Sequence, residues 1–276
     1  LIHGMNGNRI RQSTIGDKLL FVAAIAGLVL WSLLAHDRGV SAAGICVAIW
    51  FPLSVLLCRF MLRWLPVIGC IRATPSEETS QGRREITAGC LLVASFSIVF
   101  LACLPPLHAV EDIIGLNFAC LAALLDRREG WLPNYILIPM LLTGLISGMV
   151  NDNVNTAISG AAIAWGITSL ALVFISVSLR ANFLSGGDMT MATACGAWAG
   201  SDNVTLFLLL SACLHWMFCV VMRHFSIQPR RYIDLDEPGS GWVQPMGPSF
   251  AFSLAIVLLL HNMPDIPDWK YFIPGY

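Results

Sequence analysis

The run TAISGAAIAWGITSLALVFISVSL, from Thr156 to Leu179, decides the fold class of this chain. It contains no charged residue, and at helical rise it is long enough to cross the roughly 30 Å of hydrocarbon in a bilayer. Apolar runs of this kind recur along the sequence, which is 57% hydrophobic and only 12% charged. A water-soluble globule of this size needs more polar side chains on its surface. The sequence therefore predicts an all-α, polytopic transmembrane helical bundle in a lipid bilayer.

The apolar runs predict about eight or nine membrane segments, one of them a short broken helix. The segment Met189 to Gly200 is only about 18 Å long at helical rise, too short to cross the hydrocarbon alone. It begins directly after a charged residue, which is typical of a broken helix that lines a polar cavity. The nine candidates are Leu19 to His36, Val40 to Leu62, Ile86 to Leu107, Ile113 to Leu125, Tyr135 to Val150, Thr156 to Leu179, Met189 to Gly200, Val204 to Met222 and Gly247 to Asn262.

The basic residues predict the orientation of these segments, because cytoplasmic loops of membrane proteins retain Lys and Arg. If the N-terminus is cytoplasmic, only Arg38 and Lys270 among the 16 Lys and Arg residues fall on the outer side. One central helix more or fewer would destroy this asymmetry, because every later loop would change sides. We therefore expect a cytoplasmic N-terminus.

We expect a single transmembrane domain, residues 19–262. A cytoplasmic tail, 1–18, precedes it, and an extracytoplasmic tail, 263–276, follows it. The two charge-rich connections, 71–84 and 223–241, are expected to be cytoplasmic loops, and the glycines and acidic residues of the second are typical of a mobile loop that can cover a site.

Net charge and cysteine spacing exclude two classes of function. The formal net charge is -1, and no basic stripe interleaved with aromatic residues is present, so we do not expect nucleic-acid binding. None of the nine cysteines forms a C-x-x-C pair, and most lie inside apolar runs. We interpret them as small buried hydrophobic residues and expect no metal site.

Two carboxylates stand at the ends of apolar runs. Asp126 follows the run LNFACLAALL, and Asp188 follows Gly186 and Gly187 between two apolar segments. Taken singly, Asp126 can be an ordinary interfacial acid beside arginines that extend to water, and Asp188 can be a helix cap. The predicted topology, however, puts both residues on the same side of the membrane at similar depth. They are therefore the candidate functional pair.

Two carboxylates in one site cannot both ionise without strong repulsion, so one of them keeps a proton. The charged member can then act as a base on a water molecule while the protonated member donates to a scissile carbonyl. This division of roles is that of an aspartic protease.

Three motifs resemble those of the type IV prepilin peptidase family of G-x-G-D membrane aspartyl proteases. DRREGWLPN, from Asp126 to Asn134, is similar to the first-aspartate motif, in which a hydrophobic-Pro-Asn follows the Asp. SGGD, from Ser185 to Asp188, with GAWAG at 196–200, is similar to the second. QPMGPSFA, at 244–251, is similar to the entry to the last helix, and PLSVLLCR, at 52–59, is a weaker fourth match.

This resemblance implies an aspartic endopeptidase of the inner membrane, active in type IV pilus assembly or protein secretion on prepilin or pseudopilin substrates. It implies Asp126 and Asp188 as the catalytic residues. The other implied site residues are Ser185, Gly186 and Gly187 in the active-site loop, with Pro133, Asn134, Pro245, Gly247 and Pro248 in support. No cofactor is implied for proteolysis, whereas S-adenosylmethionine is implied if the new N-terminus is also N-methylated.

The chain departs from the family pattern at several places. Ser185 stands where the family has its first glycine, and Thr190 stands where Lys is usual. The connection 71–84 lacks the two C-x-x-C pairs of the zinc-binding insert, so we expect that insert to be absent. Glu129 could tune Asp126 or be solvated, and we expect it to be solvated. For His215 we expect an interhelical hydrogen bond rather than a proton relay.

Two other functions were weighed. A polytopic transporter could bind a proton or cation with the same two aspartates, but internal repeats and polar residues near mid-membrane are not evident. A presenilin-like protease that cuts within a helix is less compatible with Leu125, which stands where that group has Tyr.

Overall fold

The computed structural model describes residues 41–69, 80–104, 106–180, 185–224 and 245–262. All regular structure in these ranges is α-helical, as predicted. The chain divides into two units, 1–58 and 59–276, and each is described by itself. The predicted tails, the segment Leu19 to His36 and most of the two predicted cytoplasmic loops lie outside the described residues.

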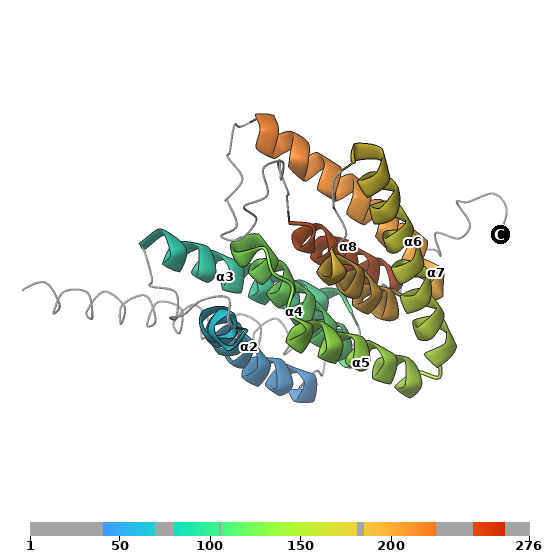
Figure 1. Ribbon diagram of the computed structural model, residues 1–276. Helices are drawn as coiled ribbons and strands as arrows, with labels where there is room; N and C mark the ends of the chain where they lie inside the picture. Colours follow the sequence, from blue (N-terminus) through green and yellow to red (C-terminus); the bar gives the residue numbers. More distant parts are fainter. Residues whose placement is uncertain (1–40, 70–79, 105, 181–184, 225–244, 263–276) are drawn as a thin grey trace, which may run out of the picture. The chain divides into compact units, whose positions relative to one another are not determined.

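Seven helices make up the described part of the chain (Figure 1). In the first unit the described residues belong to one helix, which continues into the second unit. The helices are α2 (Ser41–Ile68), α3 (Ser80–Cys103), α4 (Pro106–Glu129), α5 (Asn134–Val150), α6 (Val154–Leu179), α7 (Gly186–His224) and α8 (Gly247–Asn262).

Three segments of these helices are long and apolar enough to cross a membrane: His108–Glu129, Val154–Ser178 and Gly186–Val221. Shorter apolar stretches lie in α3, α5 and α8. The predicted number of eight or nine segments stays a prediction, whereas the character of the chain as a helical membrane protein is confirmed.

The helix α4 is longer than the predicted segment Ile113 to Leu125, because it begins at Pro106. The acidic residues Glu111 and Asp112 suggested a boundary, yet both lie inside the helix. They are tolerated there because Glu111 accepts a hydrogen bond from Asn151, which follows α5, and Asp112 accepts one from Asn262 of α8. These hydrogen bonds allow α4 to begin before its apolar run.

The helix α7 joins two predicted segments, Met189 to Gly200 and Val204 to Met222, without a loop between them. It changes direction at Gly200, which has φ 70° and ψ 167°. Glycine alone adopts this backbone conformation readily, because a Cβ atom would clash there. The predicted break in the helix is therefore a single-residue kink.

Glycines also let α6 and α7 approach each other closely. A Cβ atom added to Gly160 would overlap the carbonyl oxygen of Gly196, and one added to Gly196 would lie 2.5 Å from the Cβ of Ala164. Small residues at such contacts are typical of membrane helices, which associate through close packing. In the second unit α7 also packs against α5 and α8, and α4 packs against α3, α5 and α8 (Figure 1).

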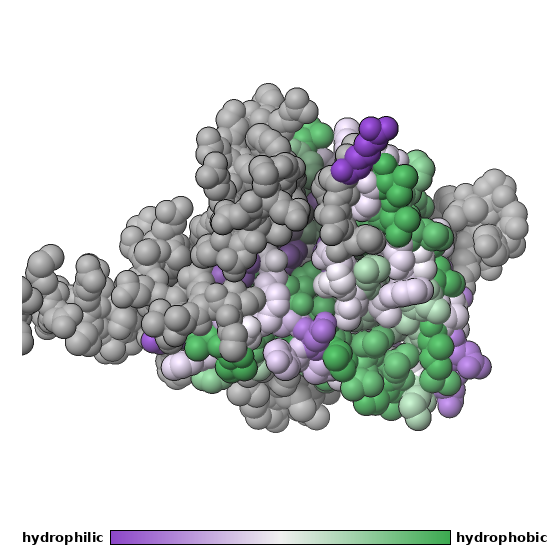
Figure 2. Space-filling model, in the orientation of Figure 1, coloured by the Kyte–Doolittle hydropathy of each residue, from purple (hydrophilic) through white to green (hydrophobic). Residues whose placement is uncertain are grey.

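The outward side of α6 is apolar, as expected for a helix that faces lipid. Figure 2 shows hydrophobic side chains over the area that α6 occupies in Figure 1. In water such a continuous apolar surface would favour association. Its largest exposed side chains are Trp165, Leu170, Phe174 and Val177.

Candidate active site

Asp126 lies near the end of α4, with its side chain against the first residue of α8. Only 6% of Asp126 is exposed. Its Oδ2 atom accepts a 2.7 Å hydrogen bond from the backbone N–H of Gly247. The first N–H groups of a helix have no partner within the helix and favour a negatively charged acceptor. The start of α8 therefore binds Asp126 directly.

Asp188 lies in the first turn of α7, and the fold brings it near Asp126. The two carboxyl groups are close enough to interact electrostatically. The end of α4 and the start of α7 thus meet the start of α8 in one place. The structure brings the two candidate acids together, while their catalytic roles stay a prediction.

Ser185, and not Asp188, caps the start of α7. The backbone N–H of Asp188 donates a long hydrogen bond of 3.4 Å to the Ser185 hydroxyl oxygen. A serine that precedes a helix and accepts from its third N–H group is a good N-cap. Serine in place of glycine at this position therefore caps the helix, so the Asp188 side chain is not needed as the cap.

The two glycines between Ser185 and Asp188 differ in their surroundings. A Cβ atom on Gly187 would lie 2.8 Å from the Cβ of Leu132, in the connection between α4 and α5. A Cβ atom on Gly186 would meet nothing within 4 Å. The close packing of the start of α7 on Leu132 therefore requires glycine at 187 but not at 186.

The connection after Asp126 is fixed by its own backbone. Gly130 ends α4 with φ 64°, and its N–H donates a 2.8 Å hydrogen bond to the carbonyl oxygen of Asp126. Pro133 precedes α5, and Asn134 is the first residue of that helix and is exposed. Sequence analysis did not single out Gly130, although a glycine after Arg127 and Arg128 is a typical helix C-terminus.

The predicted proline and glycine residues lie at the start of α8, and their supporting role stays a prediction. Pro245 precedes the helix, Gly247 opens it, and Pro248 follows, a position at which proline suits a helix start. A Cβ atom on Gly247 would lie 2.8 Å from Oδ2 and 2.9 Å from Cβ of Asp126. Only glycine therefore fits against Asp126.

The expectation that Glu129 is solvated is wrong. Its side chain is only 3% exposed, and its Oε1 atom lies 3.2 Å from Nε of Arg128. A buried carboxylate needs a partner, and the neighbouring guanidinium supplies one.

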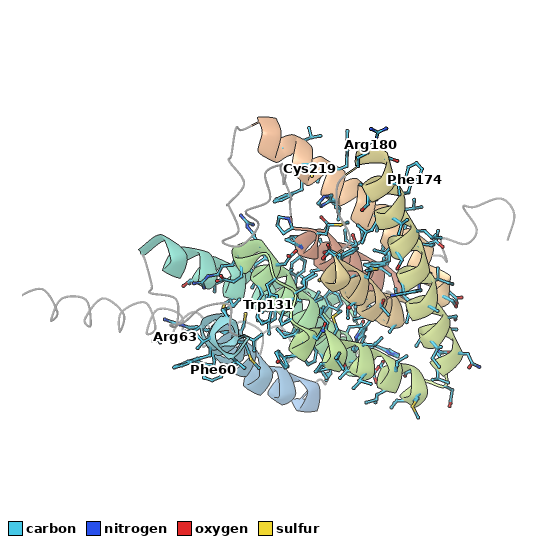
Figure 3. The ribbon with its side chains drawn as sticks, in the orientation of Figure 1. Phe60, Arg63, Trp131, Phe174, Arg180 and Cys219 are labelled. Atoms are coloured by element: carbon cyan, nitrogen blue, oxygen red, sulfur yellow. The ribbon has the colours of Figure 1, made fainter. Side chains whose placement is uncertain are left out.

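The side chain of Trp131, two residues after Glu129, packs on Gly69 after α2 (Figure 3).

The expectation of an interhelical hydrogen bond from His215 is also wrong for the described residues. Its Nε2 atom lies 3.5 Å from the sulfur of Cys219, one turn later on α7 itself (Figure 3). Its Nδ1 atom is buried and has no hydrogen-bond partner among them. The sequence showed a histidine inside an apolar helix, but not the side of the helix that it takes.

Trp198, inside the GAWAG motif, holds α7 against α4 and α5. Its indole N–H donates a 2.9 Å hydrogen bond to the carbonyl oxygen of Met140 on α5. Cβ atoms added to Gly115 of α4 or Gly144 of α5 would lie within 3 Å of its ring. This motif therefore positions α7, the helix that carries Asp188 in its first turn.

A second polar cluster, at the opposite end of α4, was missed by sequence analysis. Oδ2 of Asp112, a residue that is 6% exposed, accepts a 2.6 Å hydrogen bond from Nδ2 of Asn262 on α8. Oε2 of Glu111 accepts a 3.0 Å hydrogen bond from Nδ2 of Asn151 after α5. Two adjacent acids beside an apolar run indicated that they have buried hydrogen-bond partners. The sequence alone could not identify Asn151 and Asn262 as these partners, because they lie far away along the chain.

Comparisons with known proteins agree with the motif resemblance. Residues 113–220, which include both candidate acids, match the model of the type IV leader peptidase family. A prepilin leader peptidase/N-methyltransferase of Vibrio cholerae serotype O1 is 27% identical over 151 residues, a match that covers 52% of this chain and 54% of that protein. The chain therefore spans about half the length of this curated relative. No solved structure matches the chain.

The family match begins just after Asp112 and ends within α7, so it contains the connection after Asp126 and the Ser185 to Asp188 turn. The relative is described as a leader peptidase, as is the matching family. Over the matched segment, which holds both acids, this chain is similar to the type IV leader peptidase family.

Proposed function

We propose that this chain is an aspartyl endopeptidase that removes the leader peptide of type IV prepilin-like proteins at the cytoplasmic face of the inner membrane. The observation that carries the proposal is the packing of Gly187, next to Asp188, on Leu132 in the connection after Asp126, together with the hydrogen bond from Gly247 to Asp126. The family match and the name of the relative support the choice of substrate class.

The hydrogen bond from Gly247 supports different roles for the two acids. A backbone N–H can only donate, and so it favours the charged member of a carboxylate pair. We assign Asp126 as the base that removes a proton from water and Asp188 as the acid that donates its proton to the scissile carbonyl oxygen. The resulting tetrahedral intermediate collapses as the C–N bond breaks, and the proton held by Asp126 passes to the leaving amine.

The position of the pair suits a substrate that is itself anchored in the membrane. Both acids lie at ends of apolar helices, and the topology predicted from Lys and Arg places these ends at the cytoplasmic face. A prepilin-like substrate can then keep its hydrophobic helix in the bilayer and present the bond before it to the carboxylates. Its short basic leader would lie in the cytoplasm beside them.

The test replaces each acid by its amide in cells that co-express a prepilin. Asp126→Asn and Asp188→Asn each remove a proton acceptor or donor with little change in shape, so we expect cleavage to fall by about 10²- to 10⁴-fold or more. Mobility of the substrate and the sequence of its mature N-terminus measure cleavage, and the amount of enzyme in the membrane fraction measures insertion.

Asp152→Asn is the matched control for these variants. Asp152 is exposed in the turn between α5 and α6, and its positive φ of 56° is also accessible to asparagine. This variant should cleave at the wild-type rate. If both active-site variants retain cleavage while they insert normally, the proposed mechanism is wrong.

N-methylation of the new N-terminus, with S-adenosylmethionine as the methyl donor, is a second candidate activity. The description of the Vibrio cholerae relative as an N-methyltransferase favours it. Mass spectrometry of the mature substrate separates the two activities, because methylation adds mass to a terminus that proteolysis has already produced. A mature but unmethylated substrate would leave this chain as a peptidase alone.

A further inference from the structure

Two side-chain hydrogen bonds join α4 and α8, one at each end of the pair. At the start of α8 the N–H of Gly247 donates to Asp126, and at its end Nδ2 of Asn262 donates to Oδ2 of Asp112. Asp126 is near the end of α4 and Asp112 near its start, so the two helices run antiparallel. We call the pair Asp112–Asn262 the distal clamp.

We propose that the distal clamp is a positioning device: it fixes how far α8 lies along α4 and thereby holds the N–H of Gly247 on Asp126. This inference rests on the proposed function, because its effect on rate requires Asp126 to be catalytic. Neither clamp residue touches the candidate site, so both are positioning residues.

The rest of the α4–α8 contact determines this axial position only weakly. Three of the buried residues near Asp126 on α4 are alanines, Ala119, Ala122 and Ala123, and the buried residues of α8 are mainly apolar. Apolar contacts are non-directional, so they fix the position of one helix along another less sharply than a hydrogen bond does. A hydrogen bond instead restricts its two atoms to within a few tenths of an ångström.

The site tolerates little axial shift. A displacement of α8 by the rise of a single residue, about 1.5 Å, would break the 2.7 Å bond from Gly247. Gly247 has no side chain that could block such a displacement of α8 in one direction. In the other direction Asp126 blocks it. Misplacement of about 1 Å can reduce the rate of a catalysed reaction by about 10²-fold.

The burial of Asp112 is consistent with this role. A carboxyl group that is 6% exposed in an apolar bundle is costly unless it is hydrogen-bonded, and Asn262 supplies that bond. Glu111, the preceding residue, is bonded instead to Asn151 after α5. The start of α4 therefore has separate polar links to α5 and α8, and these links can be cut one at a time.

The test compares two double variants with the wild-type protein in a cleavage assay. Asp112→Leu with Asn262→Leu removes both partners together, which leaves no buried polar group unpaired and so favours normal folding. We expect kcat to fall by about 10- to 100-fold with KM unchanged. Asp112→Asn with Asn262→Asp exchanges the carboxylate and the amide, restores the bond and should return kcat to within a few-fold of the wild-type value.

The control cuts the neighbouring link. Glu111→Leu with Asn151→Leu removes the bond between α4 and the end of α5 but leaves α8 in place, so kcat should stay within a few-fold of the wild-type value. An equal loss of kcat in this control would mean that general loosening of the bundle, and not the position of α8, limits the reaction, and would overturn the inference.

Amide hydrogen exchange at Gly247 provides a readout that does not depend on catalysis. Loss of the distal clamp should speed exchange of this N–H, and the exchanged pair should restore its protection. Unchanged kcat and unchanged exchange in the double-leucine variant would overturn the clamp while leaving the proposed function intact. A wild-type enzyme that cleaves no prepilin would overturn the proposed function, and exchange at Gly247 would still decide whether the clamp exists.

Discussion

Gly247 meets Asp126 through its backbone, and no side chain fits between them. The carboxylate oxygen lies 2.7 Å from the amide nitrogen, and a Cβ atom at 247 would lie 2.8 Å from the same oxygen. A contact this close forces either the carboxyl group or the start of α8 to move. A physical reason for glycine in the Pro-Met-Gly-Pro motif is thus that any side chain at 247 would collide with Asp126.

We therefore expect Gly247→Ala to reduce kcat by about 10²-fold, because a displacement near 1 Å at a catalytic group has an effect of this size. Initial rates of prepilin cleavage measure it. Gly186→Ala is the comparison within the same site, since a Cβ atom there meets nothing within 4 Å. Equal rates for the two alanine variants would mean that the contact with Asp126 does not matter.

At the residue scale, the two acids were singled out by their positions beside apolar runs, whereas the glycines and prolines were implied by the motif resemblance. The roles of all these residues stay predictions. Glu129 and Asp112 were misjudged or missed, because their surroundings depend on partners. Arg128, next to Glu129, was visible as a neighbour, whereas Asn262 lies in a helix that the sequence cannot align with α4.

At the scale of whole helices, α6 and α7 pack through Gly160 and Gly196. A Cβ atom on Gly160 would overlap the backbone of α7 at Gly196 and also at Gly200. Backbone atoms cannot give way as a flexible side chain can. The helix α7, which carries Asp188 in its first turn, is therefore positioned by a contact on α6, outside the candidate site.

We expect Gly160→Ala to lower the free energy of unfolding of the protein in detergent by about 1 to 3 kcal/mol, the usual size of an overpacking penalty. Gly166→Ala is the matched control on the same helix, because a Cβ atom there meets nothing within 4 Å. Alanine is the better helix former, so the control should be neutral or slightly stabilised. The midpoint of thermal unfolding distinguishes the two, and an unchanged midpoint for Gly160→Ala would contradict the close packing.

Apolar runs predicted the helices well, and polar residues inside them set the limits of that prediction. The segments Tyr135 to Val150 and Gly247 to Asn262 lie within one residue of α5 and α8. The start of α4 was placed seven positions too late, at 113 instead of 106, because Glu111 and Asp112 interrupt the apolar run. Hydropathy measures a residue without its partners, and here the partners lie on other helices.

For the molecule as a whole, the described helix ends separate into two groups of polar residues. Asp126, Asp188 and the start of α8 meet at one end, and Asp112, Asn262 and Asn151 meet at the other. Sequence analysis predicted that Asp126 and Asp188 share a side, because one topology accounts for nearly all Lys and Arg residues. It could not predict the distances between helices, which depend on packing over the whole bundle.

This separation leads to a prediction about the membrane. Arg180 ends α6 with its side chain projecting outward (Figure 3), and Asp152 lies in the turn at the other end of that helix. If the active site faces the cytoplasm, a cysteine at 180 should react with a membrane-impermeant maleimide only in inside-out vesicles, and a cysteine at 152 only in intact cells or spheroplasts. Both substitutions, Arg180→Cys and Asp152→Cys, remove exposed side chains.

Labelling of the wild-type protein under each condition provides the background, because the chain has nine native cysteines and Cys213 is exposed. Both variants should still cleave prepilin, which shows that the labelled protein is folded. The reverse labelling pattern would place Asp126 and Asp188 on the outer face, where the cytoplasmic leader of a prepilin cannot reach them. Since a helix of this length crosses the bilayer once, labelling of both positions from the same side would contradict α6 as a membrane-spanning helix.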